Sequence, residues 1–418
     1  MINIINKEDC VGCNGCVQIC PQKCITFICD SQGFYYPKVD VSECINCGLC
    51  NKVCPVENQP TPTSPIKVYC AKNIEKSILE SSSSGGVFYA IAKLIIDEGG
   101  VVFGAGFDEN WNVRHTYTED LNGLVKFQTS KYVQSDISES YINASKFLKE
   151  GRKVLFSGTP CQISGLKLYL RKDYGAQLTT VEVICHGVPS PGIWHEYLTK
   201  LSIELSTSKE ANSSTYDNGV VHRIKRINFR DKKLGWQKFG LSIHIDGSNK
   251  ANSPDSKAFH YMLSDVVFFQ PFYENPYMLG FLNDLYLRPS CYACPAKSGK
   301  SQADISLADF WGIDKKYPEH FKNNFFSLVL VYSSNGIALL SEAAIEFCEV
   351  TYQDALSSNP AIIKSAKKPE KYYEFWKLYE RIGLESINVV NKSMQPNFIR
   401  RSLHFAKRIV HKFLSKIQ

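Results

Sequence analysis

Short apolar runs that are typical of buried strands recur along the chain after residue 65. These runs are Ile66–Lys72, Gly99–Phe107, Lys153–Ser157 and Thr180–Ile184. Helix-like patterns follow two of the turns between them, one ending at Glu98 and one ending at Arg171. Repeated strand–turn–helix units predict an α/β domain built on a largely internal, mixed sheet.

The stretch from Arg226 to Ile245 alternates between apolar and polar residues, which predicts an antiparallel hairpin with its turn near Lys232–Gly235. The basic residues in or beside this hairpin are Arg223, Lys225, Arg226, Arg230, Lys232 and Lys233. They either hold an anionic substrate or form a solvated strand face. The polar stretch 206–218 is expected to be a loop.

Residues 397–418 have the pattern of a cationic amphipathic helix. Apolar residues such as Phe398 and Leu403 fall on one half of a helical wheel, and basic residues such as Arg400 and Lys407 fall on the other. A helix of this kind lies in a membrane interface, here the inner face of a membrane. The alternative is that it packs on its own domain or on a second subunit of a homo-oligomer.

Eight cysteines near the N-terminus form two copies of one spacing, each ending in Cys-Pro. This spacing binds two [4Fe–4S] clusters, and the fourth Cys of each run ligates the other cluster. We therefore assign Cys10, Cys13, Cys16 and Cys54 to one cluster, and Cys20, Cys44, Cys47 and Cys50 to the second. Zinc sites would need pairs of Cys rather than runs of three. Cys24 and Cys29 are expected to be packing residues.

The cysteine runs predict an α+β ferredoxin-like module at the N-terminus, and a Pro-rich linker separates it from a larger α/β domain. The predicted boundaries are 1–57 for the module, 58–65 for the linker, 66–395 for the large domain (parts 66–150 and 151–395) and 397–418 for the C-terminal amphipathic helix.

Composition and charge narrow the function. The chain has 418 residues, including 16 Cys, and a net charge of +7. Most of the excess positive charge lies in residues 397–418, so a nucleic-acid-binding surface is not indicated. No apolar run approaches the roughly 18 residues of a membrane-spanning helix, and no secretory signal is expected. A thiol-rich chain of this kind is expected in the reducing cytoplasm, where thiolates bind metal.

Four further cysteines lie at places suited to chemistry. Cys161 follows Thr159-Pro160, an N-cap and first helical position whose free backbone N–H groups would stabilise a thiolate. Cys185 ends an apolar strand, and Cys291 and Cys294 form a CxxC followed by Pro. Alone, the CxxC fits a redox pair, half a zinc site or no site. Together with the two single thiols it predicts a third [4Fe–4S] cluster.

Several short motifs follow one another in a definite order: Ser82–Gly86, Ser130–Ser135, Ser157–Gln162, Cys185–Ser190, Phe229–Lys232, Arg288–Cys294 and Asp304–Gly312. In this order they resemble the beta subunit family of the deazaflavin (coenzyme F-420) hydrogenases and dehydrogenases. Members of that family hold FAD beside an iron–sulfur cluster and often carry a two-cluster ferredoxin module in front. The resemblance therefore implies that the α/β mixed-sheet domain binds a flavin.

The Ser/Gly-rich turn is the first candidate flavin contact. At Ser83, Ser84, Gly85 and Gly86 it enters a helix N-terminus, whose free N–H groups suit a pyrophosphate. The alternative is an ordinary capped helix. A nicotinamide partner has no support, because no GxGxxG turn opens a helix.

The resemblance points to further residues. Lys131 and Tyr132 would contact the flavin or its phosphates, and Asp304 and Asp309 would order the cluster loop or a flavin edge. The plainer alternatives are a surface lysine and turn-capping aspartates. His186, next to Cys185, is the candidate proton donor, with a structural role as its alternative.

The predicted function is that of an iron–sulfur flavoprotein oxidoreductase, which passes electrons between [4Fe–4S] clusters and FAD to reduce or oxidise a small organic acceptor. Two alternatives stay open. The acceptor is the deazaflavin coenzyme F-420, or the chain is a non-catalytic electron-transfer beta subunit of a larger hydrogenase or dehydrogenase complex. Its expected redox partner is a ferredoxin or a dehydrogenase subunit.

Overall fold

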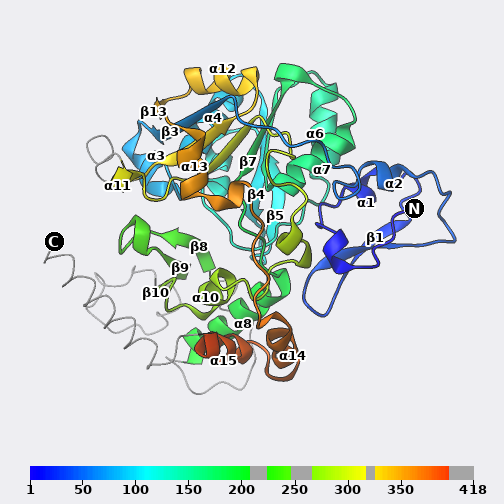
Figure 1. Ribbon diagram of the computed structural model, residues 1–418, viewed down its shortest axis with the longest axis vertical. Helices are drawn as coiled ribbons and strands as arrows, with labels where there is room; N and C mark the ends of the chain where they lie inside the picture. Colours follow the sequence, from blue (N-terminus) through cyan, green and yellow to red (C-terminus); the bar gives the residue numbers. More distant parts are fainter. Residues whose placement is uncertain (208–223, 246–265, 317–324, 395–418) are drawn as a thin grey trace, which may run out of the picture.

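The computed structural model describes residues 1–207, 224–245, 266–316 and 325–394 (Figure 1). Two predictions fall outside these ranges: most of the loop at 206–218 and the amphipathic helix at 397–418. Among the helices that are described, none combines the length and the apolar character needed to cross a bilayer.

A small N-terminal module lies at one end of the molecule, beside two helices of the large domain (Figure 1). Its elements are the antiparallel pair β1 (Ile25–Cys29) and β2 (Tyr35–Val39) and the short helices α1 (Gly15–Ile19) and α2 (Leu49–Lys52). This is the predicted α+β module.

The large domain is built on one mixed sheet of eight strands. In spatial order these are β13 (Ile345–Glu349), β3 (Lys67–Asn73), β12 (Ser327–Val331), β11 (Ile305–Asp309), β7 (Leu178–Val183), β6 (Val154–Gly158), β4 (Val101–Phe107) and β5 (Val113–Thr118). The inner strands β4, β6, β7 and β11 run parallel, and the other pairs are antiparallel. The predicted mixed sheet is confirmed, and its strands come from both sides of residue 150.

The residues that follow parallel strands lie at one edge of the sheet, where the strands have their carboxyl ends. β6 leads to Cys161, β7 leads to Cys185, and β11 ends at Asp309. These three residues, which are far apart in the sequence, therefore emerge at the same edge.

Helices cover both faces of the sheet, because alternate strand residues point to opposite sides. One face packs against α4 (Val87–Asp97), α5 (Leu121–Leu124) and α12 (Ser334–Glu342), and the other against α6 (Ser140–Lys149), α7 (Pro160–Leu170) and α13 (Tyr352–Ser358). Val102 of β4 belongs to the first layer, whereas Phe103 beside it belongs to the second. Two short helices, α3 (Lys76–Ser81) and α11 (Ile313–Lys316), follow β3 and β11.

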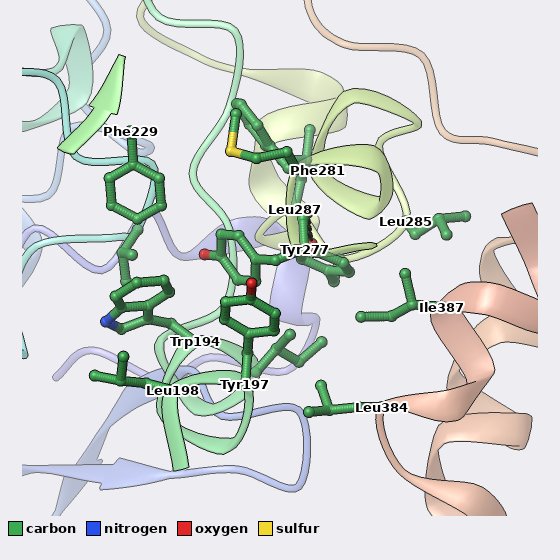
Figure 2. Packing of buried hydrophobic residues seen from close by; sticks show 14 of the residues in the cluster. Trp194, Tyr197, Leu198, Phe229, Tyr277, Phe281, Leu285, Leu287, Leu384 and Ile387 are labelled. Atoms are coloured by element: carbon green, nitrogen blue, oxygen red, sulfur yellow. Dashed lines mark hydrogen bonds between the residues drawn. The ribbon is translucent and has the colours of Figure 1, made fainter. Parts of the chain in front are cut away.

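A second packing unit lies beside the large sheet (Figure 1). It consists of the antiparallel strands β8 (Ile224–Asp231), β9 (Gly240–Ile245) and β10 (Val266–Pro271) with the helices α8 (Pro191–Thr207), α10 (Pro276–Leu282), α14 (Tyr372–Ile382) and α15 (Glu385–Met394). The predicted hairpin corresponds to β8 and β9. Trp194, Phe229 and Tyr277 meet in its core and are at most 1% exposed (Figure 2). Truncating one such ring to Ala costs about 3–5 kcal/mol.

Candidate functional site

The two N-terminal cysteine quartets surround two separate hollows in the crossed order. The inner hollow is lined by Cys10, Cys13, Cys16 and Cys54, and the outer hollow by Cys20, Cys44, Cys47 and Cys50. Burial, and then the neighbouring thiols, raise the pKa of Cys13 and of Cys16. Such a set ionises readily only when positive charge enters it, as the irons of a cluster would supply.

A fifth thiol lies at the outer hollow. Cys24 lines it and places its Sγ 3.5 Å from the Sγ of Cys20. Cys24 is buried, whereas Cys47 on the same hollow is exposed. The outer quartet is thus close to solvent on one side.

The third set of cysteines is assembled from three segments. The α7 N-terminus has the predicted N-cap Thr159 and first helical residue Pro160, and it adds a capping box with Gln162 that fixes the turn carrying Cys161. Cys185 follows β7, and the 3-10 helix η5 (Pro289–Ala293) carries Cys291 and leads directly into Cys294.

The four thiols lie within electrostatic reach of one another. Burial raises the pKa of Cys185 to about 11, with Cys294 adding to the rise and Lys297 opposing it. Burial also raises the pKa of Cys291, and the thiols of Cys185, Cys161 and Cys294 raise it further. The structure therefore brings the third quartet together.

Within the described ranges, no group of three or more His, Cys, Asp or Glu side chains is arranged to hold a single metal ion. A [4Fe–4S] cube takes one thiolate at each of four iron corners. Its ligands therefore surround a volume rather than converge on a point, which is the arrangement that the two N-terminal quartets offer.

Polar groups that the sequence did not mark support the third quartet. The Val188 N–H donates to the Sγ of Cys291 at 3.4 Å. Lys297, which is 8% exposed, donates from Nζ to the carbonyls of Cys185 at 2.5 Å and Ala361 at 2.7 Å. In the sequence, only the position of a lysine three residues after Cys294 could have indicated that these polar groups support the quartet.

Tyr141 lies between the inner quartet and the third quartet. Its side chain is fully buried, and its Oη donates to the Gln162 carbonyl at 2.7 Å. Burial raises its pKa, and the nearby thiols of Cys13 and Cys161 raise it further. One aromatic ring therefore adjoins both cysteine sets.

A cavity of about 310 Å³ lies between the Ser-rich turn and the β8–β9 hairpin. It is lined by Glu80, Ser81, Ser82, Ser83, Thr129, Arg226, Asn228, Arg230, Asp231, Lys232, Lys233 and His244. Lys232 Nζ ties the two walls together by donating to the carbonyls of Leu79 at 3.0 Å and Ser82 at 2.7 Å. The predicted basic hairpin thus faces the predicted turn across a polar cavity.

The predicted turn residues divide into two groups. Ser83 lines the cavity, whereas Ser84 Oγ donates to the Phe326 carbonyl at 3.2 Å and the Gly85 N–H donates to Ser327 Oγ at 2.9 Å. Gly86 has a left-handed φ of 71° and begins α4 without a side-chain cap. Ser84 and Gly85 are therefore engaged with the start of β12. Ser83, whose Oγ accepts from the Ser130 N–H at 2.9 Å, is the predicted turn residue that lies on the cavity wall.

Arg230 and Asp309 form a buried ion pair beside the cavity. The Arg230 Nη2 lies 2.8 Å from Asp309 Oδ2, and the guanidinium carbon lies 3.9 Å from the ring centre of Phe239. Burial raises the pKa of Asp309, although Arg230 acts against that rise. The Arg230 Nε is buried and has no hydrogen-bond partner. Tyr132 adjoins this pair, and burial raises its pKa.

The other predicted site residues are dispersed. Asp304 accepts hydrogen bonds from Thr180 and Ser333, so both of its oxygens are used in capping, which matches the plainer alternative. Lys131 donates to the Lys126 carbonyl, and burial lowers the pKa of Lys131 to about 7. His186 Nε2 lies 2.5 Å from Asp284 Oδ1, away from the residues that line the cavity.

Comparisons with known proteins agree with the two-part organisation. Residues 151–353 match the family model for the C terminus of the coenzyme F420 hydrogenase/dehydrogenase beta subunit, and residues 9–58 match the model "4Fe-4S dicluster domain". A chain in a structure of the F420-reducing [NiFe] hydrogenase complex from Methanosarcina barkeri is similar at 18% identity, with a TM-score of 0.44, over 73% of this chain and 91% of that chain. Curated proteins gave no match to the sequence.

Proposed function

We infer the function from two matches, of residues 151–353 to the family model for the C terminus of the coenzyme F420 hydrogenase/dehydrogenase beta subunit and of residues 9–58 to a 4Fe–4S dicluster domain. We propose that the protein is an iron–sulfur oxidoreductase that carries electrons between its N-terminal clusters and FAD. The observation that carries the proposal is that the outer, inner and third cysteine quartets follow one another in space. Tyr141 adjoins both the inner and the third quartet. A [4Fe–4S] cluster transfers single electrons, so successive clusters form a conductor.

The route runs from the solvent side inward. Cys47 at the outer quartet is exposed, whereas Cys10 and Cys13 of the inner quartet are buried next to the large domain. From the inner quartet the path continues past Tyr141 to Cys161. The third quartet lies at the sheet edge that also bears Asp309, which adjoins the cavity through Arg230.

The cavity residues fit an anionic cofactor such as FAD. Arg230 contributes a buried Nε without a hydrogen-bond partner, and Ser83 contributes a hydroxyl whose oxygen accepts from the Ser130 N–H. Arginines are the usual partners of phosphate oxygens. FAD, when bound, accepts electrons one at a time and delivers two to an organic acceptor.

The protein residues then have distinct proposed roles. Arg230, held by Asp309, binds negative charge on the cofactor, and Tyr132 supports the guanidinium. Burial lowers the pKa of Lys131, so its amine loses its proton readily. A nearby anion, such as a cofactor phosphate, would keep the amine protonated, and Lys131 would then supply a positive charge. His186, paired with Asp284 outside the cavity lining, would serve as proton donor to an acceptor bound beyond the cavity.

The second candidate is an electron-transfer beta subunit that works only inside a larger complex. The description of the matching family as a beta subunit favours it. Under this candidate the partner is a hydrogenase or dehydrogenase subunit. For a self-contained enzyme, deazaflavin coenzyme F-420 is the alternative acceptor to test first.

Anaerobic purification of the full chain, with iron, sulfide and flavin measured per chain, tests the proposal. About 12 irons and one FAD are expected. About eight irons would remove the third cluster, and the absence of flavin would remove the flavin step. Adding a viologen reductant and F-420 then separates the two candidates. Bleaching of F-420 supports a self-contained enzyme, and a loaded chain that turns over nothing supports the subunit.

A further inference from the structure

Arg288 of the large domain reaches into the dicluster module. Its backbone N–H donates to the Val188 carbonyl at 2.9 Å, and its carbonyl accepts from the Cys291 N–H at 2.8 Å. Arg288 is thus anchored to the two segments that carry Cys185 and Cys291. Its side chain is buried, with the residue 1% exposed.

The guanidinium contacts the module at the inner quartet. Its Nε donates to the Cys10 carbonyl at 2.7 Å, and its Nη2 donates to the Tyr35 carbonyl at 2.9 Å and to the Cys10 Sγ at 3.4 Å. Its Nη1 donates to Gln134 Oε1 at 3.1 Å. The guanidinium carbon also lies 4.3 Å from the ring centre of Tyr36. The guanidinium carbon also lies 5.5 Å from the ring centre of Phe34, so four nitrogen-to-acceptor contacts and two rings fix its position.

Within the described residues, no carboxylate forms an ion pair with this buried guanidinium. All of the hydrogen-bond acceptors of Arg288 in the described part of the chain are carbonyl or amide oxygens and one thiol. A buried cation without a counter-charge is costly, so buried arginines are normally paired with an anion. A cluster-bound thiolate of Cys10 would supply such an anion.

At the position where the module meets the guanidinium, Gly12, there is no room for a side chain. A Cβ added to Gly12 would lie 2.8 Å from Cζ of Arg288, and Gly12 has a left-handed φ of 69°. Gly12 therefore lets the module backbone approach the guanidinium closely.

The outer quartet receives a weaker donor. The Ile2 N–H donates to the Cys50 Sγ at 3.1 Å, and this donor is a neutral backbone amide. Hydrogen bonds and charge at the ligand sulphurs tune the potential of iron–sulfur clusters. A positive charge stabilises the reduced, more negative state, so the two N-terminal clusters are placed in unequal fields.

We propose that Arg288 is a positioning and potential-setting residue, whose guanidinium locks the dicluster module onto the large domain and raises the reduction potential of the cluster held by Cys10, Cys13, Cys16 and Cys54. With both clusters bound, Cys20, Cys44, Cys47 and Cys50 would hold the one that gives up an electron (1+ to 2+), and Cys10, Cys13, Cys16 and Cys54 would hold the one that accepts it (2+ to 1+), with no proton transferred. The external donor is a one-electron reductant protein at the outer quartet.

The test is a redox titration of the anaerobically purified full chain, followed by EPR. Arg288→Met removes the charge and should move the midpoint of one N-terminal cluster to a more negative potential while the other stays fixed. Arg288→Lys keeps the charge without the forked contacts and should give a smaller shift. Lys368→Met is the matched control, because Lys368 pairs with Glu8 of the same module at 2.5 Å, and it should shift neither midpoint.

Unchanged midpoints in Arg288→Met at full iron content, or equal shifts of both clusters, would overturn the proposal. If Arg288→Met loses iron, a selective loss of about four irons supports the proposal. Loss of all iron, shared with Lys368→Met, overturns it. This inference rests on the proposed function only in requiring the two N-terminal clusters. A chain with about eight irons and no flavin would still permit the titration, so the role of Arg288 and the flavin-dependent function can each fail without the other.

Discussion

A methyl group placed on Gly165 would lie only 3.2 Å from the Sγ of Cys13. Helix α7 therefore presses its backbone against the inner quartet of the dicluster module. Gly165 lies one turn after Cys161 on the same helix, so residues four apart share one face. A single helix thus contacts one cysteine quartet and carries a member of the next.

This contact predicts that Gly165→Val displaces Cys13. The added side chain would also meet Tyr141 Oη at 2.9 Å from its Cβ, so the helix has little room to adjust. Overpacking of this kind costs about 1–3 kcal/mol. We expect a lower melting temperature and a loss of up to about four irons, measured by iron assay and EPR. Gly106→Val is the control, because an added Cβ there has its nearest neighbour at 3.7 Å. Full iron and an unchanged EPR spectrum in Gly165→Val would contradict this docking.

The third quartet predicts a uniform result for four single variants. Replacing Cys161, Cys185, Cys291 or Cys294 by Ser should each remove about four irons and leave the dicluster signals in place, because a cube needs all four thiolates. Cys348→Ser is the control. Cys348 is exposed and lies opposite Cys70 across β13 and β3, so its iron content should equal that of the wild type. A loss in only one or two of the four variants would indicate a site other than a cube.

Local signals in the sequence were sufficient for much of this architecture. Thr159 and Pro160 specify the start of α7 through capping chemistry that involves only neighbours in the chain. The same holds for the apolar runs that became β4, β6 and β7. Each of these predictions depends on contacts within about one turn or one strand.

Contacts between segments that are distant in the sequence could not be predicted from such local signals. Arg288 stands directly before a recognised Cys motif, yet its role follows from a contact with Cys10, 278 residues away. Asp304 and Asp309 stand in one motif but lie at opposite ends of β11. Because of that separation, Asp304 caps the neighbouring elements while Asp309 pairs with Arg230.

The Arg230–Asp309 pair predicts separable effects on stability and on flavin binding. Arg230→Met leaves Asp309 buried without its partner, which costs about 3–5 kcal/mol. We therefore expect a clear fall in melting temperature together with loss of bound flavin. In the double variant Arg230→Met, Asp309→Asn no buried charge remains, so the melting temperature should recover in part while flavin stays absent. Lys238→Met, on the same hairpin outside the cavity lining, should retain both. Flavin per chain and thermal melting are the two measurements.

Lys131 predicts a pH-dependent reactivity that reports on the cofactor. Burial lowers its pKa from 10.5 to about 7, so the amine loses its proton near neutral pH and becomes nucleophilic there. Lys93 is the internal control, because its hydrogen bond with Asp97 raises its pKa. In acylation followed by mass spectrometry, Lys131 should reach half of its maximal rate near pH 7, and Lys93 only at much higher pH.

The same lowered pKa of Lys131 makes the stability of the protein depend on pH, because the folded state releases this proton at a lower pH than the unfolded state does. Relative to Lys131→Met, the wild type should gain stability as pH rises from about 7 to 10.5. A bound flavin phosphate would favour the charged amine and move the Lys131 midpoint upward, so equal profiles with and without flavin would place the cofactor away from Lys131.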